Sequence, residues 1–238
     1  MRHRLVRTST PVFDPGTLTL KEWQKAPFSS SPWADATGNG FTLSEATNPP
    51  TSTASINGLN YAHFDGSNDR LGGTTLSNIM STSAYSGWAL VNLDSIANVT
   101  YTQPGNGNPM IACSNGTAQW GIILYGNPSN NVVHHMFDSS STDRSISTAI
   151  STAVWQLVQW RAGSGTMEIR VNSGTWQTTA YTTGVQSLAA SLDVARNVNQ
   201  NVWQPMGMAD FGSKDTRLTD TDFDNIKSYC NLTYGLSL

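Results

Sequence analysis

Few acidic residues in this chain are placed to catalyse glycoside hydrolysis. That reaction needs two carboxyl groups that converge on one bond. Only three glutamates occur, Glu22, Glu45 and Glu168, and Glu168 has no second acid two residues away. We interpret Glu168 as a solvated strand residue that pairs with a neighbour on the next strand. The sequence therefore assigns no catalytic residue.

The stretch Asp65-Gly66-Ser67-Asn68-Asp69 is rich in oxygen ligands. Such oxygens on a tight loop suit Ca²⁺. Asp and Asn also build tight turns unaided, because their side chains bond the nearby backbone and they tolerate left-handed φ. The sequence favours turn chemistry over a calcium site, and we assign no metal or cofactor.

His134 and His135 are adjacent, so on a strand their rings point to opposite faces and cannot share a metal. We expect one buried, hydrogen-bonded histidine beside an exposed one. No Ser-His-Asp, Cys-His or phosphate-loop pattern stands out elsewhere.

Sugar binding needs an aromatic face for stacking and amides or carboxylates that hold hydroxyl groups. Tyr125 with Asn127, and Trp203 with Asn199, combine these groups on expected loops. Packed aromatics and ordinary Asn-rich turns would look the same. These four residues are candidate glycan contacts.

Arg2, Arg4 and Arg7 alternate, which places all three on one side of an extended segment. Guanidinium groups bind carboxylates in a bidentate manner. We expect residues 1–16 to form an arm that docks on an adjacent subunit, and residues 17–238 to form one domain.

Composition excludes several classes of protein. The net charge is −3 and 12% of residues are charged, which is unlike a nucleic-acid-binding domain with a basic face. No run approaches the length of a membrane helix, and no apolar segment of a signal peptide follows the first arginines. Cys113 and Cys230 could form a disulfide, but two buried free thiols are expected.

The elements that position these residues are mostly strands. Met167, Ile169 and Val171 alternate with polar residues at the centre of a predicted three-strand meander over 154–176, which we expect in the middle of a sheet. Residues 88–93 form a continuous apolar run typical of a buried strand.

One helix is predicted near the C-terminus. Thr219 can cap it, and Phe223, Ile226 and Cys230 recur at helical spacing. We expect these three side chains to face the sheets, and Asp220, Asp224 and Lys227 to face water. The chain is thus predicted to be all-β, a two-sheet antiparallel sandwich with one short C-terminal helix.

Three stretches together resemble the laminin-G-like, concanavalin A-like lectin/glucanase superfamily, in the form found in phage virion proteins. Residues 33–40 resemble its early W-D-x-S-G-N-G turn, and residues 64–71 its F-D-G-x-N-D-x-L hairpin, with Arg70 where an aromatic is common. Residues 217–222 followed by Tyr234-Gly235-Leu236 resemble its closing helix. The resemblance implies a concanavalin A-like jelly roll.

The resemblance also implies three kinds of function, because this fold carries several. The first is a non-enzymatic structural subunit that decorates a phage capsid or tail, is assembled in the host cytoplasm, contacts other virion proteins as a homo-oligomer and aids adhesion to host glycans. The second is a secreted or surface carbohydrate-binding module. A glycosidase comes last, because the E-x-D-x-E motif of the superfamily's glucanases is missing from this sequence.

Overall fold

The computed structural model describes residues 13–52, 55–75, 81, 83–96, 108–114, 119–125, 130–138, 140–181, 184, 191–197 and 202–238. Arg2, Arg4 and Arg7 lie outside these residues, as do Asn127 and Asn199.

The described residues form antiparallel strands, one 3₁₀ turn and one α-helix. The strands of the first half are β1 (Glu22–Lys25), β2 (Ser55–Ile56), β3 (Leu59–Asn60), β4 (Ala62–Asp65), β5 (Leu71–Thr75), β6 (Ala84–Leu93) and β7 (Asn108–Ser114). Those of the second half are β8 (Gln119–Tyr125), β9 (Asn131–Phe137), β10 (Asp143–Ala149), β11 (Trp155–Gly163), β12 (Thr166–Val171), β13 (Gln177–Ala180), β14 (Ser191–Val194), β15 (Arg196–Asn197), β16 (Val202–Trp203) and β17 (Pro205–Lys214). The 3₁₀ turn η1 is Pro15–Leu18 and the helix α2 is Asp220–Tyr234.

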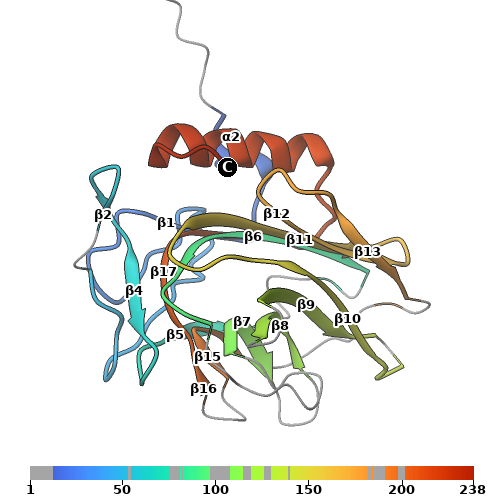
Figure 1. Ribbon diagram of the computed structural model, residues 1–238, viewed down its shortest axis with the longest axis horizontal. Coiled ribbons are helices and arrows are strands. Elements are labelled where there is room, and N and C mark those ends of the chain that lie inside the picture. Colours follow the sequence, from blue (N-terminus) through green and yellow to red (C-terminus); the bar gives the residue numbers. More distant parts are fainter. Residues whose placement is uncertain are drawn as a thin grey trace, which may run out of the picture.

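Two large sheets lie face to face, which confirms the predicted sandwich (Figure 1). The seven-stranded sheet has the order β1-β17-β6-β11-β12-β13, and β4 also pairs with β17. The six-stranded sheet has the order β10-β9-β8-β7-β14-β5. Two short hairpins, β2-β3 and β15-β16, form separate two-stranded sheets.

The main core fills the space between the sheets. Met167 and Ile169 of β12 are fully buried in it, as their alternation predicted. Trp160 and Phe211 stack with ring centroids 6.5 Å apart. The predicted buried strand is β6, which lies between β17 and β11 at the centre of its sheet.

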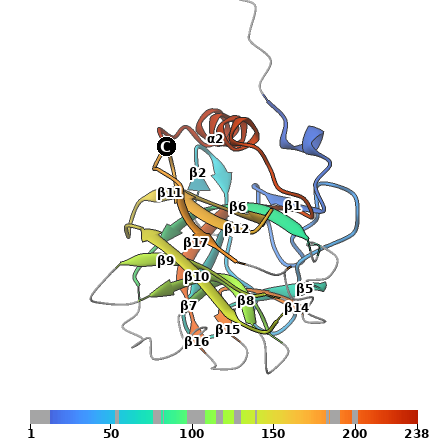
Figure 2. The same ribbon diagram turned by 90° about the vertical axis from the view of Figure 1, so that its right-hand side faces the viewer.

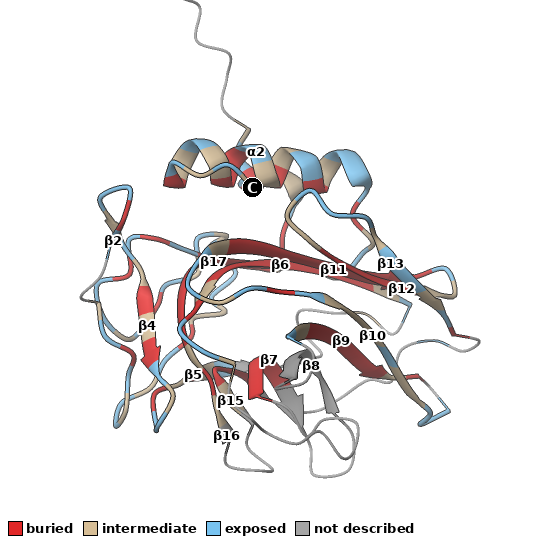
Figure 3. Ribbon diagram, viewed as in Figure 1, coloured by how far each residue is buried: buried red, intermediate tan, exposed pale blue. Residues whose placement is uncertain are grey.

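Helix α2 covers the outer face of the seven-stranded sheet and closes a second apolar cluster, as the buried residues in Figure 3 show. Phe223, Ile226 and Cys230 are fully buried there, and Cys230 is a free thiol, all as predicted. The side chain of Thr219 accepts a hydrogen bond from the Asp222 amide in a capping box. Asp220 and Asp224 are exposed, whereas Lys227 is only partly exposed. The side chain of Cys113 lies outside the described part.

Asp210 is a buried carboxylate that joins the helix to the sheet. It accepts hydrogen bonds from the indole N–H groups of Trp23 at 3.0 Å and Trp88 at 2.8 Å, and from the Tyr234 hydroxyl at 2.8 Å. Burial raises the pKa of this carboxyl group to about 6, although the three donors oppose the shift. One side chain therefore connects β1, β6, β17 and the end of α2.

The meander predicted over 154–176 is present in the structure, but its predicted position in the middle of a sheet is wrong. It corresponds to β11 and β12, and the return strand β13 starts at Gln177 rather than Thr175. These strands form one end of the seven-stranded sheet, with β13 at its edge. Alternation along a strand reports its faces and not its neighbours, so the strand order was not visible in it.

The stretch over residues 64–71 is a turn between sheets rather than a hairpin. β4 pairs with β17 in one sheet, and β5 pairs with β14 in the other. The Asp65 carboxylate accepts bonds from the Ser67 amide at 2.7 Å and the Asn68 amide at 3.3 Å, and the Asp69 carboxylate accepts one from the Asp65 amide at 3.0 Å. The acidic side chains here build the turn.

Candidate ligand-binding site

A hairpin at one end of the six-stranded sheet presents an aromatic ring beside a guanidinium group. In the β15-β16 hairpin Arg196 pairs with Trp203, and the guanidinium carbon lies 4.9 Å from the ring centroid. This distance is that of a cation–π contact. Trp203 remains partly exposed.

Backbone bonds fix the hairpin against the sheet. The Ala195 amide donates to the Met110 carbonyl at 2.9 Å, and the Gln204 amide donates to the Ala195 carbonyl at 3.0 Å. The Gln204 side chain donates to the Ser95 carbonyl at 2.7 Å. The position of the Trp203 ring is therefore set by strand pairing on one side and a buried amide on the other.

A charged cluster lies next to this hairpin. Asp193 sits between Leu192 and Val194, which face the core, so its side chain is on the outer face of the six-stranded sheet. The Arg70 guanidinium lies 3.6 Å from the Asp193 carboxylate and also pairs with Glu45. Burial raises the pKa of Asp193 to about 6, and the charges of Arg70 and Arg196 oppose this shift. Two acidic and two basic side chains thus gather next to Trp203. The two arginines are partly exposed, whereas the carboxylates of Asp193 and Glu45 are largely buried beneath them.

Small residues flank Asp193 and allow its carboxylate to pack closely against the neighbouring strands. It lies opposite Gly72 of β5 and Ala112 of β7. A methyl group at Gly72 would come within 3.2 Å of the Asp193 carboxylate. Farther along the same row, Gly121 of β8 lies opposite Ala112 and His135 of β9. The row has no bulky side chain between Asp193 and His135.

His135 ends this row, and the prediction that one of the two histidines is exposed is wrong. Both are fully buried. The His134 ring contacts the Tyr85 hydroxyl at 2.7 Å, and burial lowers its pKa to about 3. His135 pairs with Asp143 at 2.7 Å. The outward neighbour Val133 is buried too, so this face of β9 is not a solvated face.

The chemistry of this cluster suits a polyhydroxylated ligand. Carboxylates accept and guanidinium groups donate hydrogen bonds, so together they can satisfy hydroxyl groups, which do both. An amphipathic indole adds an apolar surface for the ligand's C–H groups. We call the set Glu45, Arg70, Asp193, Arg196 and Trp203 the Trp203 cluster.

The predicted glycan residues are only partly placed. Trp203 lies at this site. Tyr125 is the last residue of β8. Its neighbour Leu124 pairs with Asn108, the first residue of β7, and β7 contacts the β15-β16 hairpin. The side chain of Tyr125 is outside the described part, as are Asn127 and Asn199. The charged residues were missed, although an acid between Leu192 and Val194 in a strand is a signal that could have identified Asp193.

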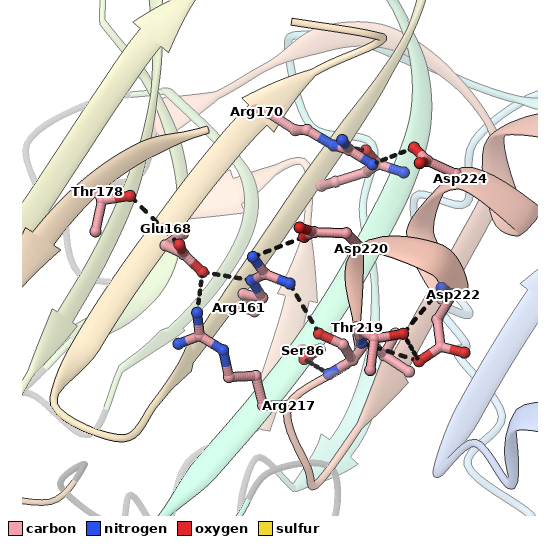
Figure 4. A network of polar contacts seen from close by, with 12 residues as sticks. Ser86, Arg161, Glu168, Arg170, Thr178, Arg217, Thr219, Asp220, Asp222 and Asp224 are labelled. Atoms are coloured by element: carbon pink, nitrogen blue, oxygen red, sulfur yellow. Dashed lines mark hydrogen bonds and ion pairs between the residues drawn. The ribbon is translucent and has the colours of Figure 1, made fainter. Parts of the chain in front are cut away.

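A second polar cluster lies under helix α2 (Figure 4). Glu168 pairs across the strands with Arg161, as predicted, but it is buried rather than solvated, because α2 and the segment before it cover this face. Glu168 also pairs with Arg217, and Arg161 with Asp220 at 2.8 Å. These ion pairs attach the helix to the sheet.

A further ion pair between the sheet and α2 follows along the helix. Arg170 pairs with Asp224 at 2.9 Å, and the Trp176 ring lies 4.4 Å from the Arg161 guanidinium carbon and 4.5 Å from that of Arg170. The acids in this region are thus bound to arginines and hold α2 in place.

A hollow of about 470 Å³ lies elsewhere, beside η1. It contains the ion pair of Lys21 with Asp215, at 3.0 Å. Its lining has hydroxyl and amide groups but no aromatic ring, so it offers less for a sugar than the Trp203 cluster does. Among the described residues, no group of His, Cys, Asp and Glu could hold a metal ion, and none of the helices is long and apolar enough to cross a membrane.

Comparison with known proteins supports the fold. No family model matches the chain, and no curated protein matches it significantly. Among solved structures, the binding domain of Paraclostridial mosquitocidal protein 1 is similar, with a TM-score of 0.66, 14% identity and coverage of 92% of this chain and 54% of that one. The botulinum neurotoxin serotype G binding domain has a TM-score of 0.64 and 14% identity. The match covers 87% of this chain and 50% of the neurotoxin domain.

A third similar structure is the ligand-binding domain of botulinum neurotoxin serotype D in complex with N-acetylneuraminic acid. Its TM-score is 0.64 at 13% identity, over 89% of this chain and 52% of that one. The chain thus spans about half the length of the structures it matches. At this identity the likeness shows a β-sandwich fold that other proteins use in binding domains.

Proposed function

We propose that this chain is a non-enzymatic carbohydrate-binding module and that the Trp203 cluster is its glycan site. The observation that carries the proposal is the partly exposed Trp203 ring, fixed beside Arg196 and next to the Asp193–Arg70–Glu45 cluster. An accessible indole with a few hydrogen-bonding side chains beside it is the usual combination in a sugar site.

The similar structures support the proposal in part. They are binding domains, and one was solved with a sialic acid. Because this chain matches only about half of that domain, the sugar contacts there are not assigned to residues here. The glycan is therefore left to experiment.

The test is a glycan array probed with the full chain, followed by titration of the best ligand. Trp203→Ala should weaken binding about tenfold or more, because it removes the stacking surface; tenfold corresponds to about 1.4 kcal/mol. Leu232→Ala is the matched control, since Leu232 is 63% exposed on α2, on the opposite side of the molecule. Unselective binding on the array, or unchanged affinity of the Trp203 variant, would refute the proposal.

We propose as a second role that the module is a subunit of a phage virion, bound through its arginine-rich arm. The resemblance of residues 33–40, 64–71 and 217–236 to virion proteins motivates this role, and the geometry of the domain suits an anchor of this kind. The described chain begins at Phe13, which packs in the apolar cluster under α2, whereas β15 and β16 lie on the opposite side (Figure 1). A subunit anchored by the segment before Phe13 would keep the Trp203 cluster directed away from its support.

A further inference from the structure

The sandwich has two flanks, on which the edge strands of both sheets meet, and one flank is sealed. On the left in Figure 1, the outer side of β1 is closed by a loop. The Trp23 amide donates to the Asp35 carboxylate at 3.1 Å, and the Ala36 amide donates to the Trp23 carbonyl at 2.7 Å. These bonds occupy backbone groups that would otherwise pair with another strand.

The other two strands of this flank are closed in the same way. His63 of β4 exchanges backbone bonds with Thr51, both at 2.9 Å. Gly72 of β5 exchanges them with Ser44, at 2.8 and 3.1 Å. No second chain can add a strand at these positions without displacing a segment of this chain.

In the part of the chain that the structure describes, the opposite flank is open at β13. Tyr181 donates to the Gly165 carbonyl at 2.9 Å, and Thr179 and Gln177 lie two and four residues away in the same register with β12. Hydrogen-bonded positions alternate in an antiparallel ladder, so Thr178 and Ala180 direct their N–H and C=O groups away from β12. Within the described part of the chain these groups have no backbone partner, and both residues are exposed.

Among the described residues, this edge also lacks the sequence features that usually protect an edge against pairing. Natural edges are blunted by charges, proline or a covering loop. β13 reads Gln-Thr-Thr-Ala and has no charge and no proline. β10, the edge strand of the other sheet, packs beside β13 on this flank. A partner that pairs with β13 would thus meet both sheets.

We propose that the β13 edge binds a second copy of this chain. An antiparallel pair with its two-fold axis at Thr179 places Thr178 opposite Ala180 of the other copy, and Ala180 opposite Thr178. Each of these two pairs can exchange both backbone bonds. The edge is complementary to itself, neutral, and used up by one partner, so the product is a closed dimer. This proposal is independent of the glycan site.

The first test measures molar mass by light scattering and sedimentation across protein concentrations of about 1 to 200 µM. The full chain should show a dimer that dissociates on dilution. The double variants Thr178→Lys/Ala180→Lys and Thr178→Glu/Ala180→Glu each put like charges opposite one another and should be monomeric. A mixture of the two should recover a dimer that contains one copy of each.

The control Ser228→Lys/Leu232→Lys adds the same charge at exposed positions of α2 and should leave the dimer unchanged. Thermal melts establish that each variant is folded. A full chain that stays monomeric at 200 µM, or a Lys/Lys variant with the mass of the wild-type dimer, overturns the proposal. So does a mixture of the Lys/Lys and Glu/Glu variants that stays monomeric.

A second variant does not depend on charge. At the proposed axis the two Thr179 residues face each other at a non-hydrogen-bonded position, where the Cα atoms lie about 4.5 Å apart, and this spacing allows a disulfide. Thr179→Cys should therefore yield a covalent dimer on mild oxidation, and Thr221→Cys on the exposed side of α2 should not. Equal cross-linking of the two variants would contradict the assigned register.

Discussion

At the scale of single residues, Asp210 is a buried hydrogen-bonding centre whose contribution to stability can be tested. Its carboxylate satisfies three donors that have no solvent access. Asp210→Ala should reduce the free energy of unfolding by about 3 kcal/mol or more, because each buried donor left unpaired costs about 1–3 kcal/mol. Urea denaturation measures the loss.

Asp210→Asn is the matched control. An amide oxygen can accept from both indoles, and the amide nitrogen can donate to the Tyr234 hydroxyl, which is able to accept a bond. The loss should therefore be roughly 1 kcal/mol. Equal losses for the Ala and Asn variants would mean that these hydrogen bonds contribute little.

The same carboxyl group predicts a pH dependence. Folding raises the pKa of Asp210 from 3.8 to about 6, so the folded state binds the proton more tightly than the unfolded state. This contribution to stability is fully present below about pH 4 and is lost as the pH rises through about 6. Wild type should therefore gain stability relative to Asp210→Asn, on the order of 3 kcal/mol, between pH 7 and pH 4. Urea titrations at both pH values test this, and a constant difference between the two proteins would contradict it.

At the scale of elements, helix α2 packs on the outer face of the seven-stranded sheet. The contribution of this packing to stability can be tested at Phe223. Its ring contacts Trp176 with centroids 5.2 Å apart and is fully buried. Phe223→Ala should cost roughly 3–5 kcal/mol in unfolding free energy, as for buried aromatics in general. Leu232→Ala, on the exposed side of the same helix, should change it by less than about 0.5 kcal/mol. Normal stability of the Phe223 variant in urea denaturation would show that the helix is loosely attached.

Local patterns predicted the elements but not what covers them. The alternation around Met167 and Ile169 gave the core face of β12, and the spacing of Phe223 and Ile226 gave the inner face of α2. The other face of β12 appeared solvated, because Glu168 and Arg170 are charged. In the fold the helix lies over that face, and this contact joins residues about fifty positions apart.

The candidate site was also predicted only in part, because local patterns do not show which distant residues meet in the fold. Trp203 could be selected by its residue type and its Asn-rich neighbourhood. Its neighbours could not, because Arg70 and Asp193 meet only when β5 and β14 pair across more than a hundred residues. Strand order and register are set by packing of the whole domain, and a single sequence does not display them.

At the scale of the whole molecule, if residues 1–16 act as a docking arm, their removal should affect assembly but not the stability of the domain. Deletion of residues 1–12 should abolish incorporation into purified particles, measured by mass spectrometry, and leave the thermal midpoint nearly unchanged. The described packing begins at Phe13, so the deletion removes none of it. Arg2→Gln/Arg4→Gln/Arg7→Gln keeps the length and should be defective in the same way, since exposed ion pairs depend on these charges.

A truncated chain that assembles normally would refute the docking role of the arm. A thermal midpoint several degrees lower would instead show that the segment belongs to the fold of the domain.

The two ends of the described chain lie on the same side of the molecule (Figure 1 and Figure 2). Phe13 packs in the cluster under α2, and Leu238 is held beside that helix, where its carbonyl accepts a bond from Ser173 at 2.9 Å. Because both ends leave the domain on the side of α2, this domain could be spliced into a surface loop of an unrelated carrier protein. Its six-stranded sheet would then still point away from the carrier.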